Sequence, residues 1–356
     1  MAFFSWVGAE QRLSNAALTV LVQAISPNDQ DQLLWDVFFP RQDVDSVVVE
    51  TITPLIATRF VSDRREWNAR GRFIPQEFPG TGELEMVPIE AYFKLAEREI
   101  QNLEETAYAN EALFQKLLGV QIPDRTEGLA RANLRRIELD TFNAWSLGQV
   151  SVRNPVTGTL YTASYGFDVT RYTTAGPAWT GGVGGTAYNS LLTWLLAGID
   201  RGMTIQGVML RLSTREAIRT SAPNMAFPVN TNIPPVLADV EKRLSDEIGA
   251  EFRFYLNERH VDVFATGGLA TTVTKLWPAL TVAVVPAGET VGFQAYAPVA
   301  RAFDISRTSP EAEIDVNGMI AYTETAGNGR ELTVECQVNA MPVPLERNIW
   351  VINAGI

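Results

Sequence analysis

The sequence predicts an α+β fold, in which helices and β-strands occupy separate stretches of the chain. Residues 51–88 have the pattern of two long extended arms, and residues 124–147 have that of one long helix. β-Branched strand segments return in the C-terminal part, after a central stretch in which helices and strands alternate. With 356 residues, the chain has enough material for one large or two ordinary domains.

The composition is that of an ordinary globular protein, with 46% apolar and 20% charged residues. The net charge of −12 argues against a general nucleic-acid-binding surface, which would be basic. Basic residues are mostly arginine, with 25 Arg against 4 Lys. Arginine is favoured at protein interfaces because its planar guanidinium makes several directed contacts, although a GC-rich genome would produce the same bias.

The sequence offers no candidate catalytic, cofactor-binding or metal-binding residues. Cys336, the single cysteine, is expected to be a buried strand thiol. His260 is the single histidine, and the sequence contains no G-x-S-x-G motif that would supply a serine nucleophile for it to activate. The TGGVGG run at residues 180–185 lacks the Lys-Ser/Thr pair of a phosphate loop. The acidic run at residues 29–36 lacks the glycine and the final glutamate of a calcium loop. We also expect no secretory signal and no membrane span.

The first 50 residues are expected to form an N-terminal arm and a docking strand. Residues 15–25 read as a short apolar helix or strand that ends at SPND, and residues 33–40 are apolar but interrupted. Residues 45–52 are β-branched and lead into the first extended arm.

The two extended arms, residues 51–68 and 72–88, cannot bury their apolar side chains within themselves. A two-stranded ribbon alone is marginal in water, and prolines interrupt its pairing. At ~3.3 Å per residue each arm reaches roughly 60 Å, so we expect the ribbon to lie on another copy of the chain. The side chains expected to make that contact are Arg59, Arg64, Arg65, Trp67, Arg70, Arg72 and Phe73.

Residues 89–120 have helical spacing and many strong helix formers, although their beginning can also belong to the returning arm. Asp124 and Glu127 have the spacing of a capping box and predict a second helix start. That helix runs to Gly148, and its roughly 22 residues at ~1.5 Å each make a rod of roughly 33 Å. Residues 149–166 predict a hairpin.

The central and C-terminal stretches predict further helices and strands. A helix at residues 187–202 ends at a glycine stop, residues 205–212 form a strand, and Ser213 caps another helix. Pro234 and Pro235 open an amphipathic helix that Gly249 closes. Strands are also predicted at residues 252–257, 260–265 and 280–287, and a long hairpin at residues 313–340 turning at residues 326–329.

This order of elements resembles the Hong Kong 97-type capsid fold, and more closely the lambda-type major capsid proteins (family E) of tailed phages. The resemblance covers nearly the whole chain and is carried by the order of elements more than by any single motif. The segments that carry it are FIPQEFPG at residues 73–80, EGLARANLRRIELDTFNAW at 127–145, NPVTG at 154–158, VMLRLSTREA at 208–217 and the long C-terminal strand pair.

The resemblance implies named parts for the chain. These are an N-terminal arm and docking strand (1–50), an extended loop (51–93), a peripheral domain (94–185) with a spine helix (125–147), an axial domain (186–307), and return strands of the peripheral domain with the C-terminus (308–356). Two departures matter. The extended loop contains no lysine, so the lysine–asparagine crosslink of the type member is not expected. A long helical N-terminal scaffolding segment is also missing, so a scaffold would have to be another protein.

The resemblance further implies a major capsid protein, without enzymatic activity, that assembles in the host cytoplasm into the hexamers and pentamers of an icosahedral virion. The implied partners are a scaffold, a portal, a decoration or cement protein, and double-stranded DNA that is enclosed without sequence-specific binding. One alternative is the shell of an encapsulin-type nanocompartment or a gene transfer agent. A second alternative is an acidic β-rich hydrolase or sugar-binding protein, which would need a convergent polar site.

Overall fold

The computed structural model describes residues 14–24, 35–46, 48–52, 81–86, 88–95, 111–153, 160–182, 184–223, 235–264, 271–309, 312–326 and 331–355. Its α-helices are α2 (Asn15–Gln23), α3 (Trp35–Phe38), α5 (Glu111–Leu147), α6 (Ala187–Asp200), α7 (Leu212–Ser221), α8 (Leu237–Ile248) and α9 (Ala300–Thr308). The strands of the two larger sheets are β1 (Arg41–Asp43), β4 (Ile89–Leu95), β7 (Tyr172–Thr174), β8 (Ile205–Leu210), β9 (Arg253–Leu256), β12 (Thr281–Pro286), β13 (Gly292–Ala297), β14 (Ile320–Ala326), β15 (Glu331–Pro344) and β16 (Val351–Asn353).

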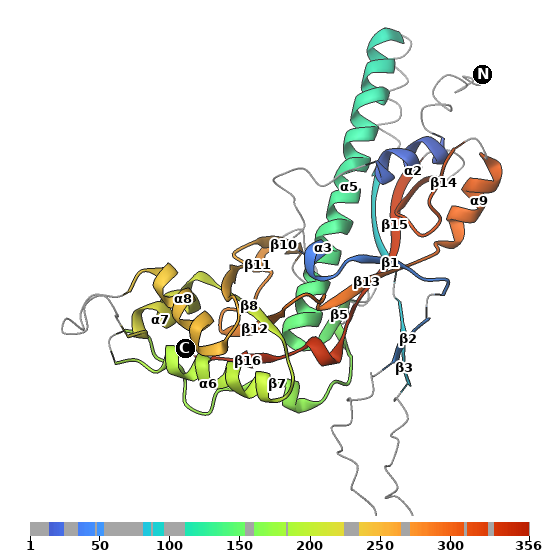
Figure 1. The fold of residues 1–356 in the computed structure, drawn as a ribbon. Helices are drawn as coiled ribbons and strands as arrows, with labels where there is room; N and C mark the ends of the chain where they lie inside the picture. Colours follow the sequence, from blue (N-terminus) through green and yellow to red (C-terminus); the bar gives the residue numbers. More distant parts are fainter. Residues whose placement is uncertain are drawn as a thin grey trace, which may run out of the picture.

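Three further strand pairs form separate two-stranded ribbons, each antiparallel. They are β2 (Val48–Ile52) with β3 (Thr81–Glu85), β5 (Gln149–Arg153) with β6 (Leu160–Ser164), and β10 (His260–Phe264) with β11 (Thr271–Lys275). The β2–β3 pair is the base of the predicted extended ribbon, and it projects away from the body of the molecule (Figure 1). The β5–β6 hairpin confirms the hairpin expected after the long helix.

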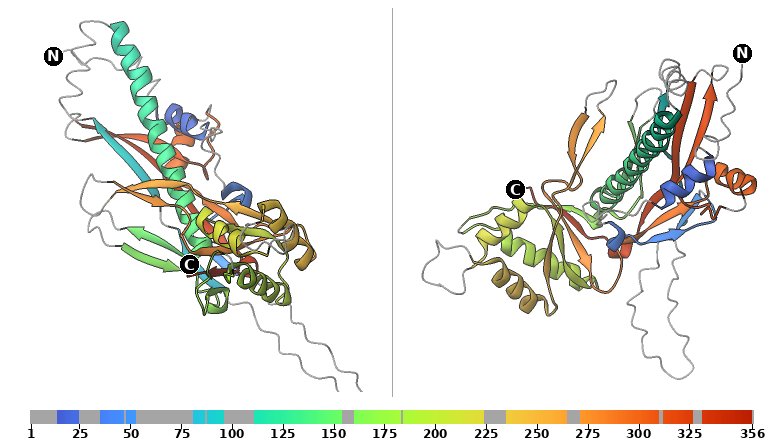
Figure 2. Two further views of the ribbon diagram at one scale, coloured as in Figure 1. Left: turned by 90° about the vertical axis from the view of Figure 1, so that its left-hand side faces the viewer. Right: turned by 90° about the horizontal axis from the view of Figure 1, so that it is seen from above.

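Helix α5 is the axis on which the other elements are assembled. It spans 37 residues, or about 55 Å, and runs alongside β15 (Figures 1 and 2). From Ile137 to Phe142 every residue is buried, because sheets and hairpins surround this half of the helix. Its C-terminal end was predicted correctly, since Gly148 adopts a positive φ of 66° directly after the last turn.

The predicted start of this helix at Asp124 is wrong. The helix begins at Glu111 and passes through Pro123, although proline in a helix interior costs about 3 kcal/mol. Ile122 is buried in the main core, and the buried Thr126 donates to the Ile122 carbonyl at 2.8 Å. Packing on both sides of the proline therefore continues the helix across a residue that the sequence pattern treats as a boundary.

The first sheet has the order β1-β13-β15-β14, and β4 pairs with the other edge of β15. The long hairpin β14–β15 was predicted from the sequence, and β4 shows that the stretch after residue 88 begins as the returning arm rather than as helix. The predicted extended segment 51–93 therefore ends inside β4, a strand of the main sheet.

The second sheet, with the order β7-β16-β12-β8-β9, is covered on both faces. Strand β12 is buried at all of its positions, and its side chains divide by the two-residue period of a strand. Val282 and Val284 pack with α6, α7 and α8, whereas Ala283 and Val285 pack toward α5. This double coverage explains why the strand reads as an unbroken apolar run.

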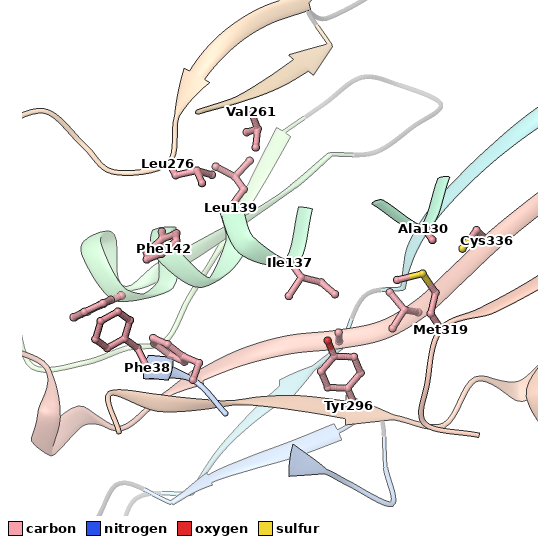
Figure 3. Close-up of a cluster of buried hydrophobic side chains, with 14 of the residues drawn as sticks. Phe38, Ala130, Ile137, Leu139, Phe142, Val261, Leu276, Tyr296, Met319 and Cys336 are labelled. Atoms are coloured by element: carbon pink, nitrogen blue, oxygen red, sulfur yellow. The ribbon is translucent and has the colours of Figure 1, made fainter. Parts of the chain in front are cut away.

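The main core lies where the C-terminal half of α5 meets both sheets (Figure 3). Trp145 lies at its centre, with ring centroids 5.1 Å from Phe38 and 5.3 Å from Trp277. Figure 3 also shows Val261 and Leu276 of the β10–β11 hairpin lying toward Leu139 of α5. The core thus joins segments from the whole length of the chain.

Several other elements differ from the sequence expectations. Helix α7 begins at Leu212 rather than after Ser213, because the Glu258 carboxylate accepts from the Leu212 backbone N–H at 2.7 Å and replaces a local cap. Helix α9 and strand β11 were not predicted, since each is short and depends on the surface beside it. Helix α8 and its stop at Gly249, with a φ of 71°, agree with the prediction.

Candidate assembly surfaces

The residues predicted to make intersubunit contacts all lie outside the described part of the chain. These are Arg59, Arg64, Arg65, Trp67, Arg70, Arg72 and Phe73. The structure describes the β2–β3 strand pair, which flanks the segment that carries these residues. In that ribbon Ile52 pairs with Thr81 and Val48 with Glu85, so the two arms enter and leave side by side.

The three strands β4, β15 and β14 form a sheet region with two different faces. On one face Val334, Cys336 and Val338 are buried against α5. On the other face the register places three cross-strand rows. The rows are Lys94–Thr333–Glu324, Tyr92–Glu335–Tyr322 and Glu90–Gln337–Ile320.

Helix α9 covers only the β14 side of this second face. Ile320 and Tyr322 pack under α9 against Val299, Ala302 and Ile305. The β4 side has no such cover within the described residues, and Tyr92 is 60% exposed. We call this uncovered region, made by Glu90, Tyr92, Lys94, Glu335 and Gln337, the open sheet face.

Carboxylates dominate the charge at the open sheet face. Arg301 of α9 forms an ion pair with Glu324 and lies 4.2 Å from the centre of the Tyr322 ring. Burial, followed by repulsion from Glu335 and Glu324, raises the pKa of Glu90. A cation brought to this face would relieve that repulsion.

Two buried carboxylates of α5 hold neighbouring elements, and sequence reasoning missed both. Glu138 is fully buried and pairs with Arg259, which directly precedes β10. Asp140 is 6% exposed and pairs with Arg136, which also donates to the Ser151 carbonyl of β5. The apolar period of the helix gave no signal for these acids, because their burial depends on the sheets and hairpins that surround residues 137–142 in the folded protein.

The sequence features considered above as possible catalytic or phosphate-binding groups are Cys336, the glycine-rich loop at residues 180–185 and His260. Cys336 is buried, and burial raises its pKa to about 12, so the thiol stays protonated. In the glycine-rich loop, the Gly182 N–H donates to Thr220 at 2.9 Å and the Thr180 N–H to Thr186 at 3.1 Å, so both donors are used internally. His260 is exposed and lies opposite Lys275 in the β10–β11 hairpin.

The described residues contain no group of three or more His, Cys, Asp or Glu side chains arranged to hold a metal ion. No helix within the described ranges combines the length and the apolar character needed to cross a membrane.

The chain matches solved structures over nearly its whole length. A phage-related protein from Bordetella bronchiseptica RB50 superposes with a TM-score of 0.50 and 13% identity, covering 95% of this chain and 96% of that one. A protein assigned as a capsid protein of a prophage in Escherichia coli CFT073 superposes with a TM-score of 0.51 and 11% identity, covering 94% of each chain.

The chain has the Hong Kong 97-type capsid fold. The match confirms the fold that the order of elements predicted. No family model matches the chain. No curated protein matches it either. The similarity to these solved structures therefore lies in the fold, because sequence identities of 13% and 11% support no comparison beyond it.

Proposed function

We propose that this chain is a shell subunit, specifically the major capsid protein of a tailed-phage head, which assembles into hexamers and pentamers around double-stranded DNA. The observation that carries the proposal is the superposition with a prophage capsid protein over 94% of both chains. The proposed function is structural, with assembly energy from area buried between copies.

We further propose that the arginine-rich arm, residues 59–72, of one copy rests on the open sheet face of a neighbour. The arm carries five arginines, and the open sheet face presents Glu90 and Glu335 beside the exposed ring of Tyr92. Guanidinium groups pair with carboxylates and stack on aromatic rings, so this face offers both kinds of partner. The β2–β3 pair itself projects away from the body of the molecule, which favours a neighbour as the recipient (Figure 1).

The remaining partners follow from the same proposal. The net charge of −12 suits a wall that encloses DNA without binding its sequence. Scaffold, portal and cement proteins are proposed as separate chains. We also propose the division into arm (1–50), extended loop (51–93), peripheral domain (94–185 and 308–356) and axial domain (186–307).

An encapsulin-type nanocompartment or a gene transfer agent shell is the alternative within the same fold. The second alternative, a hydrolase or sugar-binding protein, would need several polar side chains that converge on one site. The buried titratable groups described above, Glu138, Asp140 and Cys336, instead have structural roles.

The test is the assembly state of the purified full-length chain, measured by sedimentation and negative-stain electron microscopy. The proposal expects closed icosahedral shells, alone or after addition of a scaffold. Particles isolated from the natural source should protect double-stranded DNA from nuclease. Shells filled with an enzyme would favour the nanocompartment, and a protein that stays monomeric under all these conditions would refute a shell function.

A further inference from the structure

The sheet region made by β4, β15 and β14 has two outer edges, and helix α2 covers the one on β14. Thr19 of α2 is fully buried, and its hydroxyl donates to the Ala321 carbonyl at 2.9 Å and accepts from the Ala321 N–H at 3.2 Å. Asn15 Oδ1 accepts from the Thr323 N–H at 2.9 Å. The side chains of α2 therefore take the place of a further strand beside β14.

These contacts determine which backbone groups point outward across the region. In an antiparallel sheet, the backbone groups of successive residues point alternately to the two sides of a strand. Because Ala321 points toward α2, Tyr322 points toward β15 and bonds to its partner Glu335. The next residue of β15, Cys336, then points toward β4 and bonds to its partner Ala91. The residues of β4 on either side of Ala91 consequently point away from β15.

The outer edge of β4 is therefore formed by the backbone groups of Glu90, Tyr92 and Lys94. All three residues are exposed, and outside the sheet ladder the described residues supply no hydrogen bond to their N–H or C=O groups. The strand has a regular register with β15 and contains no proline or bulge that would prevent pairing. Folded proteins usually protect such an edge, so an uncovered one beside the open sheet face is a site for another strand.

We propose that the edge of β4 receives the first extended arm of a second copy of the chain as an added strand. This inference rests on the proposed shell function and specifies the backbone contact through which the arm binds. Residues 55–67 of the first arm contain no proline, are nearly twice as long as β4, and include β-branched and aromatic residues that suit a strand. The second arm contains Pro75 and Pro79, which have no N–H to donate to a ladder.

The arm of the same chain starts in the wrong place to reach this edge. In the β2–β3 ladder, Ile52 lies opposite Thr81, and Val48 lies opposite Glu85. The chain continues from Glu85 into β4, so the arm departs from the end of the ribbon that is farther along the chain from β4. Figure 1 shows this ribbon projecting away from the body of the molecule. A second copy is therefore the occupant that the geometry favours.

The side chains of the first arm match the two sides of β4. Alternate residues of a strand lie on opposite faces, so Arg59 and Arg65 would share one face and Ile56 and Phe60 the other. The arginines suit the carboxylates of the open sheet face. The apolar pair suits the α5 side, where the partly buried Phe93 of β4 packs against the main core.

The test is the binding of a synthetic peptide of residues 55–67 to the unassembled full-length chain, measured by fluorescence anisotropy. Two modified peptides separate backbone pairing from side-chain contact, because one carries N-methyl groups at even-numbered positions and the other at odd-numbered positions. Only one edge of an added strand pairs with β4. One modified peptide should therefore bind about 10-fold or more weakly than the unmodified peptide, and the other should retain its affinity.

A variant of β4 tests the same contact from the protein side. Lys94→Pro removes an outward N–H, and Lys94→Ala is its reference because it removes the same side chain but keeps the N–H. Lys94→Pro should bind the peptide about 10-fold less tightly than Lys94→Ala at an equal melting temperature. In the wild-type chain, saturating peptide should slow hydrogen exchange at the Glu90, Tyr92 and Lys94 amides.

Equal binding of the two modified peptides, or no binding of the unmodified peptide, would overturn the proposal. The peptide measurements decide this without any change to the protein, so they stand even if Lys94→Pro folds poorly. A wild-type chain that never forms shells would instead refute the shell function, and the peptides would still show whether the edge of β4 accepts a strand.

Discussion

Arg259 Nη1 lies 3.0 Å from Glu138 Oε1, and this carboxylate is fully buried in the C-terminal half of α5. Arg259 also anchors the β10–β11 hairpin, since its carbonyl accepts from the Leu276 N–H at 3.0 Å. Its own N–H donates to Asn257, whose N–H in turn donates to Leu210 of β8. The pair therefore connects α5, the hairpin and the second sheet through one buried charge.

Replacing Arg259 with alanine should destabilise the protein by about 3–5 kcal/mol, because it leaves a buried carboxylate without its cation. Chemical denaturation of the full-length chain would measure the loss. Adding Glu138→Gln to Arg259→Ala should recover part of this loss, since the double variant has no unpaired carboxylate at position 138. Arg253→Ala is the matched control, because that arginine forms an exposed pair with Glu251 and should change stability little. Equal effects of Arg259→Ala and Arg253→Ala would contradict the role assigned to the buried pair.

Cys336 should not react with thiol reagents in the folded protein. Its side chain is buried against α5, and burial raises its pKa to about 12, so the reactive thiolate is scarce at neutral pH. Mass spectrometry after treatment with iodoacetamide should find no adduct under native conditions and complete modification in denaturant. Rapid native modification would mean that β15 separates from α5 far more often than this packing allows.

Deleting residues 62–73 should leave a subunit that folds but does not build stable shells. The deleted segment includes Arg64, Arg65, Trp67, Arg70 and Arg72, which are proposed to contact a neighbour. Circular dichroism would report the folding of the subunit and sedimentation the assembly. Shells of normal size from the deletion variant would exclude a structural role for the loop tip.

Reversing charges on the two proposed partners should block assembly separately and restore it together. Arg64→Glu with Arg65→Glu places acids on the arm, and Glu90→Arg with Glu335→Arg places bases on the open sheet face. Each pair alone should reduce shell yield strongly at unchanged melting temperature, and the four changes together should recover it. Single exposed pairs contribute only ~0–1 kcal/mol, so the effect arises from repetition at every subunit contact.

Glu251→Arg serves as the control for this charge exchange, because it reverses an exposed carboxylate away from the open sheet face. It should leave shell yield unchanged. Failure of the combined variant to assemble, with each half intact as a monomer, would show that the arm contacts a different surface.

Mature particles should contain no covalent mesh of the lysine–asparagine type. The loop offers arginines, whose guanidinium groups stay protonated and are poor nucleophiles. Lys94 is the nearest amine, and it lies in β4 opposite Thr333 of β15. Boiling purified particles in detergent should give one band near 39.2 kDa. A persistent ladder of larger bands, with the bond mapped to Lys94, would disprove the prediction.

Local sequence signals determined many elements of this protein. The glycine stops at Gly148 and Gly249, the β14–β15 and β5–β6 hairpins and the apolar run of β12 all appear where turn chemistry and periodicity place them. The order of these elements was sufficient to predict the capsid fold, because the resemblance rests on which helices and strands follow one another along the chain rather than on individual contacts.

Only the tertiary structure decided the rest. The long helix continues through Pro123 because Ile122 and Thr126 are buried on either side of it, and α7 starts at Leu212 because Glu258 arrives from a distant turn. Glu138 and Asp140 are buried because sheets and hairpins surround residues 137–142 of α5, although acids on a helix are solvated by default. A local sequence pattern indicates which secondary structure a segment prefers. Whether its side chains are buried, and which residues distant in sequence they contact, depends on the position of that segment in the folded chain.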